Sequence, residues 1–172
     1  MFVKATHDII KLDMQTALPM VLSAIKAQTL QCYNVKKADE TCRYEGPCAI
    51  GICIDFEVRH ELDVISSNDD YSRMKLLKKY FGAEIDDSSI SINGFIDRFY
   101  ELGIFDIPKE QVRNFKDMQR KHDDAVLAST LCFEYKENTL GYINAKEEYE
   151  KSIVRFEEYV RELAFKYGVP IE

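Results

Sequence analysis

The chain has 172 residues, 46% of them hydrophobic and 12% aromatic, which excludes a disordered polymer and suits one packed domain. Its net charge of −7 and pI near 5.1 provide no basic footprint for a phosphate backbone, so nucleic acid is not an expected partner. Seven Gly and four Pro are too few for a turn-rich all-β fold, so the composition favours a helical protein.

The first helix is predicted near the N-terminus. Thr16 is a suitable N-cap for a helix that runs through about Leu30, with Pro19 tolerated in the first turn. Residues 31–46 lose the helical periodicity and are predicted to form a loop.

A buried segment follows that loop. The run at residues 48–54 is apolar on all sides and forms either two helical turns or a short strand. Pro47 at a first helical position favours the helix. Asp55 then caps a short helical segment through Asp63.

The middle of the chain predicts two further helices. The first covers residues 71–81 and is stopped by Gly82, after which the polar residues 83–91 form a loop. Asn93 caps the second helix, which carries several aromatic residues and ends at Gly103.

Two long helices complete the chain. They cover about residues 109–135 and 142–167, and each repeats apolar residues at alternating three- and four-residue spacing, which is typical of helix-on-helix packing. The break at residues 138–141 is short, so the two helices form an antiparallel pair. We therefore predict an all-α fold, with a single multi-helix domain over residues 1–172 that ends in this antiparallel pair.

Three polar residues interrupt the apolar stripe of the 109–135 helix: Gln119, His122 and Ser129. Gln119 and His122 are neighbours on one face, and Asp123 follows at the edge of that face. A buried polar group must be hydrogen-bonded, so one interpretation is a core histidine satisfied by a backbone carbonyl, Asp123 or a glutamine. The other interpretation is a His122 that contacts a ligand or takes part in catalysis.

Cys48 is the candidate nucleophile. It follows a Gly-Pro pair and is therefore expected at a helix N-terminus, where the helix dipole lowers the pKa of a thiol. With His122 and Asp123 it would form a Cys-His-Asp arrangement of the hydrolase kind. As a small hydrophobe, Cys48 is also a common core residue. The candidate catalytic residues are thus Cys48, His122 and Asp123, and the candidate ligand-binding residues are Gln119, His122 and Cys48.

The five cysteines are read as reduced thiols of a cytoplasmic protein. Charged residues such as Lys4, Asp8 and Lys11 interrupt any apolar leader, and no stretch approaches the roughly 18 apolar residues of a membrane span. No metal site is predicted, because the spacing of Cys42, Cys48 and Cys53 lacks the two-residue step of zinc knuckles. No phosphate loop or other cofactor motif is present, so no cofactor is expected.

Three segments resemble small uncharacterised proteins encoded by bacteria and their phages. The segment at residues 43–51 (RYEGPCAIG) resembles their C-A-I/V-G signature, and Leu102-Gly-Ile104 and Met118-Gln119-Arg-Lys-His122-Asp123 resemble their Leu-Gly-Ile segment and L-Q-x-x-H-D helix. The likeness covers about residues 43–125. The chain departs from it by Met118 in place of Leu and by an insert near residues 83–92. The resemblance implies a phage or prophage accessory protein in the host cytoplasm, and implies no reaction.

Two functions from different classes remain. With no recognisable catalytic signature, the leading hypothesis is a non-enzymatic accessory protein that binds a host or phage macromolecule or sequesters a small ligand. Its partner is thus a protein or a small ligand, and the apolar seam of the 142–167 helix also predicts a homodimer. The alternative is a hydrolase or transferase that uses Cys48, His122 and Asp123.

Overall fold

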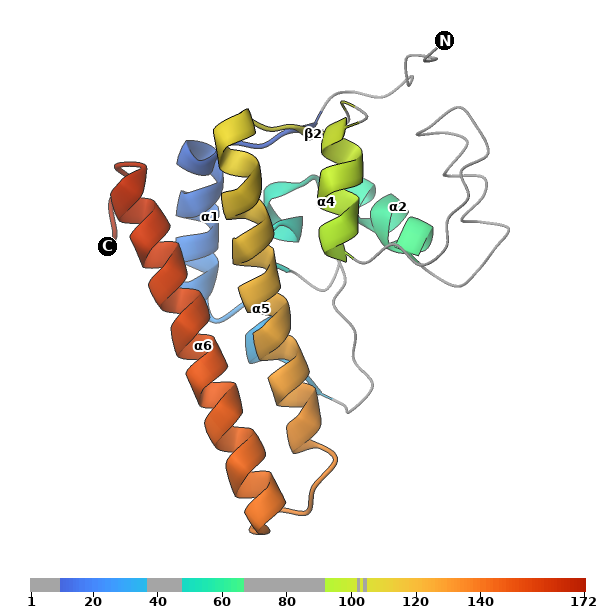
Figure 1. Cartoon of the computed structure of the whole chain (residues 1–172), viewed down its shortest axis with the longest axis vertical. Coiled ribbons are helices and arrows are strands. Elements are labelled where there is room, and N and C mark those ends of the chain that lie inside the picture. The colour runs from blue at the N-terminus through green and yellow to red at the C-terminus, as the bar shows by residue number, and fades with distance from the viewer. Residues whose placement is uncertain (1–9, 37–47, 67–91, 102, 104) are drawn as a thin grey trace.

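The computed structural model describes residues 10–36, 48–66, 92–101, 103 and 105–172, and these form an all-α arrangement (Figure 1). The all-α class and the antiparallel pair of long C-terminal helices are confirmed. The helix predicted over residues 71–81 and the loop at 83–91 lie outside the described residues. The helices are α1 (Met14–Ala27), α2 (Phe56–Ser66), α4 (Ile92–Glu101), α5 (Val112–Cys132) and α6 (Leu140–Lys166), with short 3₁₀ helices η1 (Gln31–Tyr33), η2 (Gly51–Cys53) and η3 (Lys109–Gln111).

The long pair consists of α5 and α6, which lie side by side along most of their length (Figure 1). Thr139 caps α6, because its hydroxyl oxygen accepts a hydrogen bond from the N–H of Tyr142 at 3.3 Å. The predicted seam of α6 is buried inside the chain, and Phe156, Val160 and Leu163 are at most 3% exposed. A homodimer through this helix would therefore use its opposite face.

Helix α1 packs against α6 and starts two residues before the predicted cap. Asp13 is the cap instead of Thr16: its carboxylate accepts hydrogen bonds from both the N–H and the hydroxyl of Thr16, at 3.0 and 3.1 Å. The earlier start places Pro19 in the second turn. The helix ends at Ala27 because Gln28 adopts the left-handed conformation (φ 53°) that closes helices.

A two-stranded parallel sheet, which the sequence did not predict, joins the start of the described chain to its middle. Ile10 of β1 (Ile10–Lys11) pairs with Phe105 of β2 (Phe105–Asp106). Just before β2, the predicted aromatic helix is observed as α4, and Gly103 follows it with a positive φ of 71°. Asn93 lies inside α4 instead of capping it, since the helix begins one residue earlier.

The apolar run after Cys48 forms a turn and the three-residue η2, not the two α-helical turns that were favoured. Cys48, Ala49 and Ile50 are completely buried, as the uniformly apolar run predicts. Helix α2 then begins directly after Asp55 and reaches Ser66, three residues beyond the predicted end.

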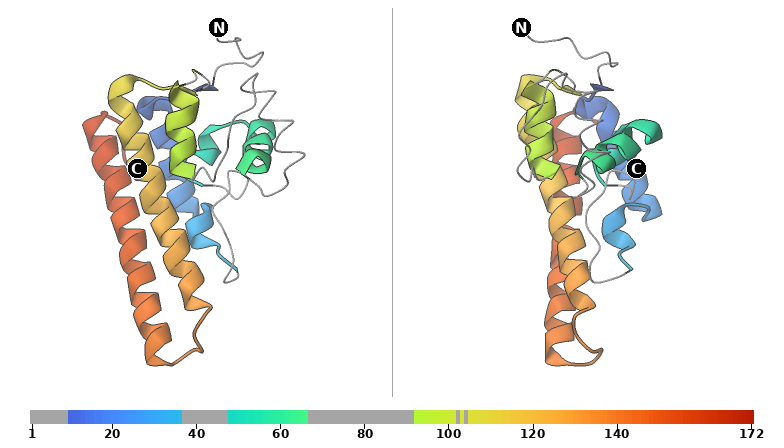
Figure 2. Two further views of the ribbon diagram at one scale, coloured as in Figure 1. Left: turned by 45° about the vertical axis from the view of Figure 1, so that its right-hand side comes forward. Right: turned by 90° about the vertical axis from the view of Figure 1, so that its right-hand side faces the viewer.

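One hydrophobic core connects these elements, with buried residues from α1, the run before η2, α4, α5 and α6. The ends of α5 and α6 that meet at residues 133–139 extend past the other helices in all three views (Figures 1 and 2). None of the helices in the described part of the chain is long and apolar enough to span a bilayer.

Candidate functional site

Gln119, His122 and Asp123 meet on the inner side of α5, as their spacing predicts; we call these three residues the polar cluster. Gln119 and His122 are completely buried, and the Asp123 side chain is 23% exposed. Oδ1 of Asp123 accepts a hydrogen bond from Nε2 of Gln119 at 2.6 Å and lies 3.2 Å from Nδ1 of His122. One carboxylate oxygen therefore holds both of its neighbours.

Both ring nitrogens of His122 have partners. Nε2 lies 3.3 Å from the backbone N–H of Cys32 in η1, and that group can only donate, so Nε2 is the acceptor. The ring proton is then on Nδ1, where it faces Asp123. Phe156 of α6 meets the ring edge-on, with centroids 5.6 Å apart. The ring is thus a neutral imidazole held in one tautomer.

Gln119 binds a second remote segment. Its Oε1 accepts a hydrogen bond from the backbone N–H of Ile50, in the buried turn before η2, at 3.0 Å. The hydroxyl of Tyr149 in α6 donates a hydrogen bond to the Cys32 carbonyl at 2.9 Å, so the N–H and the C=O of Cys32 are both paired. Buried backbone groups need such partners, because an unpaired one costs about 1–3 kcal/mol. The polar cluster therefore satisfies backbone amides that η1 and the Cys48 turn leave open.

Cys48 shares this core and has a different partner. Its Sγ accepts a hydrogen bond from the N–H of Gly51 at 3.1 Å, while the Nε2 atom of His122 is occupied by Cys32. Burial, and secondarily the charge of Asp123, raises the pKa of the Cys48 thiol from 9.0 to about 12. This is opposite to the shift expected of a nucleophile at a helix N-terminus. The Cys48 turn and the polar cluster are thus joined by the hydrogen bond between Ile50 and Gln119. The contacts described above include no hydrogen bond between the Cys48 thiol and the His122 imidazole.

Burial raises the pKa of the other described thiols as well. Burial raises the pKa of Cys53 to about 12 and also raises the pKa of Cys32. Within the described residues, no three His, Cys, Asp or Glu side chains are placed to hold a metal ion. Cys42, part of the cysteine spacing considered above, lies outside that part of the chain.

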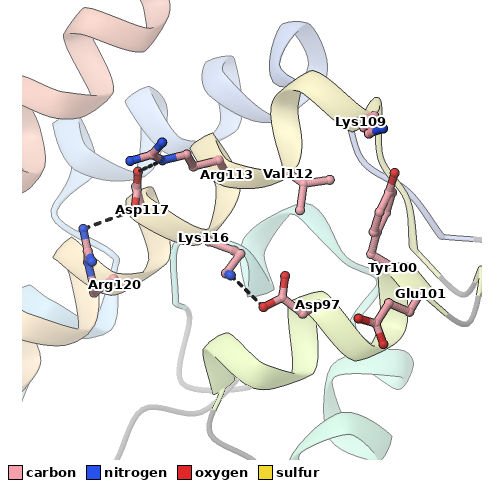
Figure 3. Close-up of a pocket in the computed structure, with 9 residues that line it drawn as sticks. All are labelled: Asp97, Tyr100, Glu101, Lys109, Val112, Arg113, Lys116, Asp117 and Arg120. Carbon is pink, nitrogen blue, oxygen red and sulfur yellow. Dashed lines mark hydrogen bonds and ion pairs between the residues drawn. The ribbon is translucent and has the colours of Figure 1, made fainter.

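A groove of about 780 Å³ opens between α4 and α5, on the outer side of α5 (Figure 3). Two ion-pair systems line it: Asp117 pairs with two arginines of its own helix, and Lys116 joins α5 to α4 by an ion pair with Asp97 at 2.6 Å. This groove was not predicted from the sequence. The cationic residues recur on α5 at three- and four-residue spacing, which was visible, but nothing local indicates that α4 lies opposite. The lining residues are Asp97, Tyr100, Glu101, Lys109, Val112, Arg113, Lys116, Asp117 and Arg120.

The meeting ends of α5 and α6 expose apolar side chains; we call residues 127–143 the hairpin end. Ten large apolar side chains are exposed in the described part of the chain, and six of these lie in the hairpin end. They are Leu127, Leu131, Phe133, Tyr135, Leu140 and Ile143.

Comparison of the chain with protein-family models, with curated proteins and with solved structures gives no match.

Proposed function

We propose that this chain is a non-enzymatic binding protein that contacts a protein partner through its hairpin end. The clustering of exposed apolar side chains there carries the proposal. Exposed apolar residues scattered singly need no explanation, whereas a group of them on a projecting end is typical of an interaction surface. Leu140 and Leu127, at 73% and 61% exposure, are the most accessible members.

The backbone of the hairpin end is well supported, which favours binding. Thr139 caps α6, and the Thr130 hydroxyl donates to the Leu127 carbonyl at 2.7 Å. The Tyr135 ring lies against Gly141 so closely that a Cβ at that position would overlap it. A surface presented on an ordered backbone loses less conformational entropy when a partner binds.

The polar cluster supports the non-enzymatic part of the proposal. A nucleophile and its base must be within hydrogen-bond reach, and the acceptor nitrogen of His122 is engaged by the Cys32 backbone. A Cys48 pKa of about 12 leaves almost no thiolate at neutral pH. Because residues 43–125 resemble proteins encoded by bacteria and their phages, we propose that the partner is a host or phage protein in the cytoplasm.

Site-specific photo-crosslinking tests the proposal. A photoreactive amino acid replaces Leu127 or Leu140 in the full chain, and Glu150 on the exposed side of α6 serves as the control position. We expect one partner protein to crosslink in the native host from the two leucine positions and not from position 150, and the crosslink from position 127 to be lost when Leu140→Glu is added. Equal crosslinking from all three positions, or a crosslink only to a second copy of the chain, would overturn the proposal.

A further inference from the structure

The α4–α5 groove is separate from the hairpin end, and its size and lining suit a small molecule. Its volume of about 780 Å³ falls within the roughly 300–1,000 Å³ of ligand pockets. Its lining contains four cationic side chains against three carboxylates. In a chain of net charge −7, this is a local reversal of charge.

Two arginines with a shared carboxylate form one end of the groove. Asp117 lies 3.7 Å from Nε of Arg113 and 3.1 Å from Nη2 of Arg120, so it forms an ion pair with both guanidinium groups. Their side chains are 91% and 58% exposed. Each guanidinium carries five N–H donors, and one carboxylate satisfies only a minority of the donors on the pair. The remaining donors are accessible to an anion.

The two lysines add positive charge along the same side. Nζ of Lys116 binds Asp97 at 2.6 Å, so it is held in the groove and not extended into solvent. The side chain of Lys109 forms no hydrogen bond or ion pair with another described residue. Lys109 therefore contributes a charge that none of the described residues neutralises.

The other end of the groove is partly apolar, because Tyr100 and Val112 line it. Tyr100 of α4 stands near Lys109 in Figure 3, with one part of its side chain packed against the core, and Val112 faces it from α5. Val112 and Arg120 are eight residues apart, or about 12 Å along the helix axis at 1.5 Å per residue. The groove thus has an aromatic end and a doubly cationic end on one continuous wall.

We propose that this groove binds a nucleoside phosphate, with its phosphates on Arg113, Lys116 and Arg120 and its base against Tyr100 and Val112. Guanidinium and ammonium groups are the usual phosphate donors in proteins, and arginine forms paired hydrogen bonds to phosphate oxygens. A base stacked on an aromatic ring contributes about 1–3 kcal/mol. This site is independent of the protein contact at the hairpin end.

Calorimetric titration of the full chain with ADP, pyrophosphate and adenosine tests the site without metal ions. We expect ADP to bind about tenfold more tightly than pyrophosphate, because only ADP adds the stacking contribution. Adenosine should bind more weakly than ADP, and ADP affinity should fall as salt rises from about 50 to 200 mM.

Variants separate the two ends of the groove. Arg113→Gln/Arg120→Gln, at two exposed positions, should weaken ADP and pyrophosphate about tenfold or more. The matched control Lys151→Gln/Arg155→Gln, also exposed and ion-paired on α6, should leave both affinities unchanged. Tyr100→Leu should remove the preference for ADP over pyrophosphate. Equal losses in the groove and control variants, or ADP no tighter than pyrophosphate in the unmodified chain, would overturn the assignment.

Discussion

The backbone N–H of Cys32 donates to Nε2 of His122 at 3.3 Å, across 90 residues of sequence. This contact fixes the imidazole tautomer, because the opposite ring nitrogen must then carry the proton that faces Asp123. It also joins η1 to the middle of α5. The histidine that resembles a catalytic residue in the sequence therefore has a structural role in holding a distant backbone segment.

Replacing the imidazole by a ring without nitrogens tests that role. His122→Phe keeps most of the volume but leaves the buried N–H of Cys32 unpaired, so it should lower the free energy of unfolding by about 1–3 kcal/mol. His122→Ala adds a cavity and should cost about 3–5 kcal/mol. Urea unfolding measures both. A His122→Phe protein as stable as the unmodified chain would show that the hydrogen bonds of the ring do not contribute.

Gln119→Glu should make stability depend on pH. The introduced carboxyl group is buried beside Asp123, and both effects raise its folded pKa above the unfolded value of about 4.3. The folded state then holds the proton more tightly, so stability is close to normal below about pH 4 and is lost as pH rises. Urea unfolding between pH 4 and 8 measures this loss, and Gln119→Glu/Asp123→Asn, without the second charge, should show a weaker dependence. Parallel pH profiles for the two variants would argue against the coupling.

The buried thiols should react slowly. Because burial raises the pKa of Cys48 and Cys53 to about 12, iodoacetamide at pH 7.5 should label them more slowly than a free thiol. Cys53 and Cys132 are both partly buried whereas Cys48 is completely buried, so Cys48 should react last. Peptide mass spectrometry after timed quenching gives the order, and labelling in urea is the control. A Cys48 that reacts faster than glutathione would restore the hydrolase alternative.

Stability should also fall in alkali. The folded pKa of Cys48 is raised from 9.0 to about 12, so the unfolded thiol ionises first and stabilises the unfolded state as pH rises above 9. The stability that the neutral thiol contributes is thus fully present below pH 9 and lost towards pH 12. Urea unfolding at pH 8 to 10.5 should show a smaller decline in Cys48→Ala than in the unmodified chain. Identical declines would mean that Cys48 ionises equally in both states.

The parts that sequence predicts are those with local signatures. Three- and four-residue spacing located α5 and α6 to within a few residues, and the same spacing placed Gln119 and His122 on the inner face. The prediction that polar residues in an apolar stripe have buried hydrogen-bond partners is confirmed for Gln119 and His122.

The identity of those partners was not predictable. The remote partners of the cluster are the backbone N–H groups of Cys32 and Ile50, which donate to His122 and Gln119, and a backbone amide has no sequence signature. The parallel pairing of β1 with β2 is missed for the same reason, since it joins two-residue strands far apart in the chain. The cap of α1 was misplaced because Asp13 and Thr16 are both good capping residues, and the sequence does not rank them.

Hydrogen exchange at two backbone amides tests the central claim most directly, namely that the polar cluster holds η1 and the Cys48 turn against α5. By NMR, the amides of Cys32 and Ile50 should exchange slowly in the unmodified chain. His122→Phe should accelerate exchange at Cys32, and Gln119→Leu should accelerate it at Ile50, each with little effect on the other amide. Exchange of both amides at unprotected loop rates in the unmodified chain, or equal acceleration at both sites in either variant, would contradict the claim.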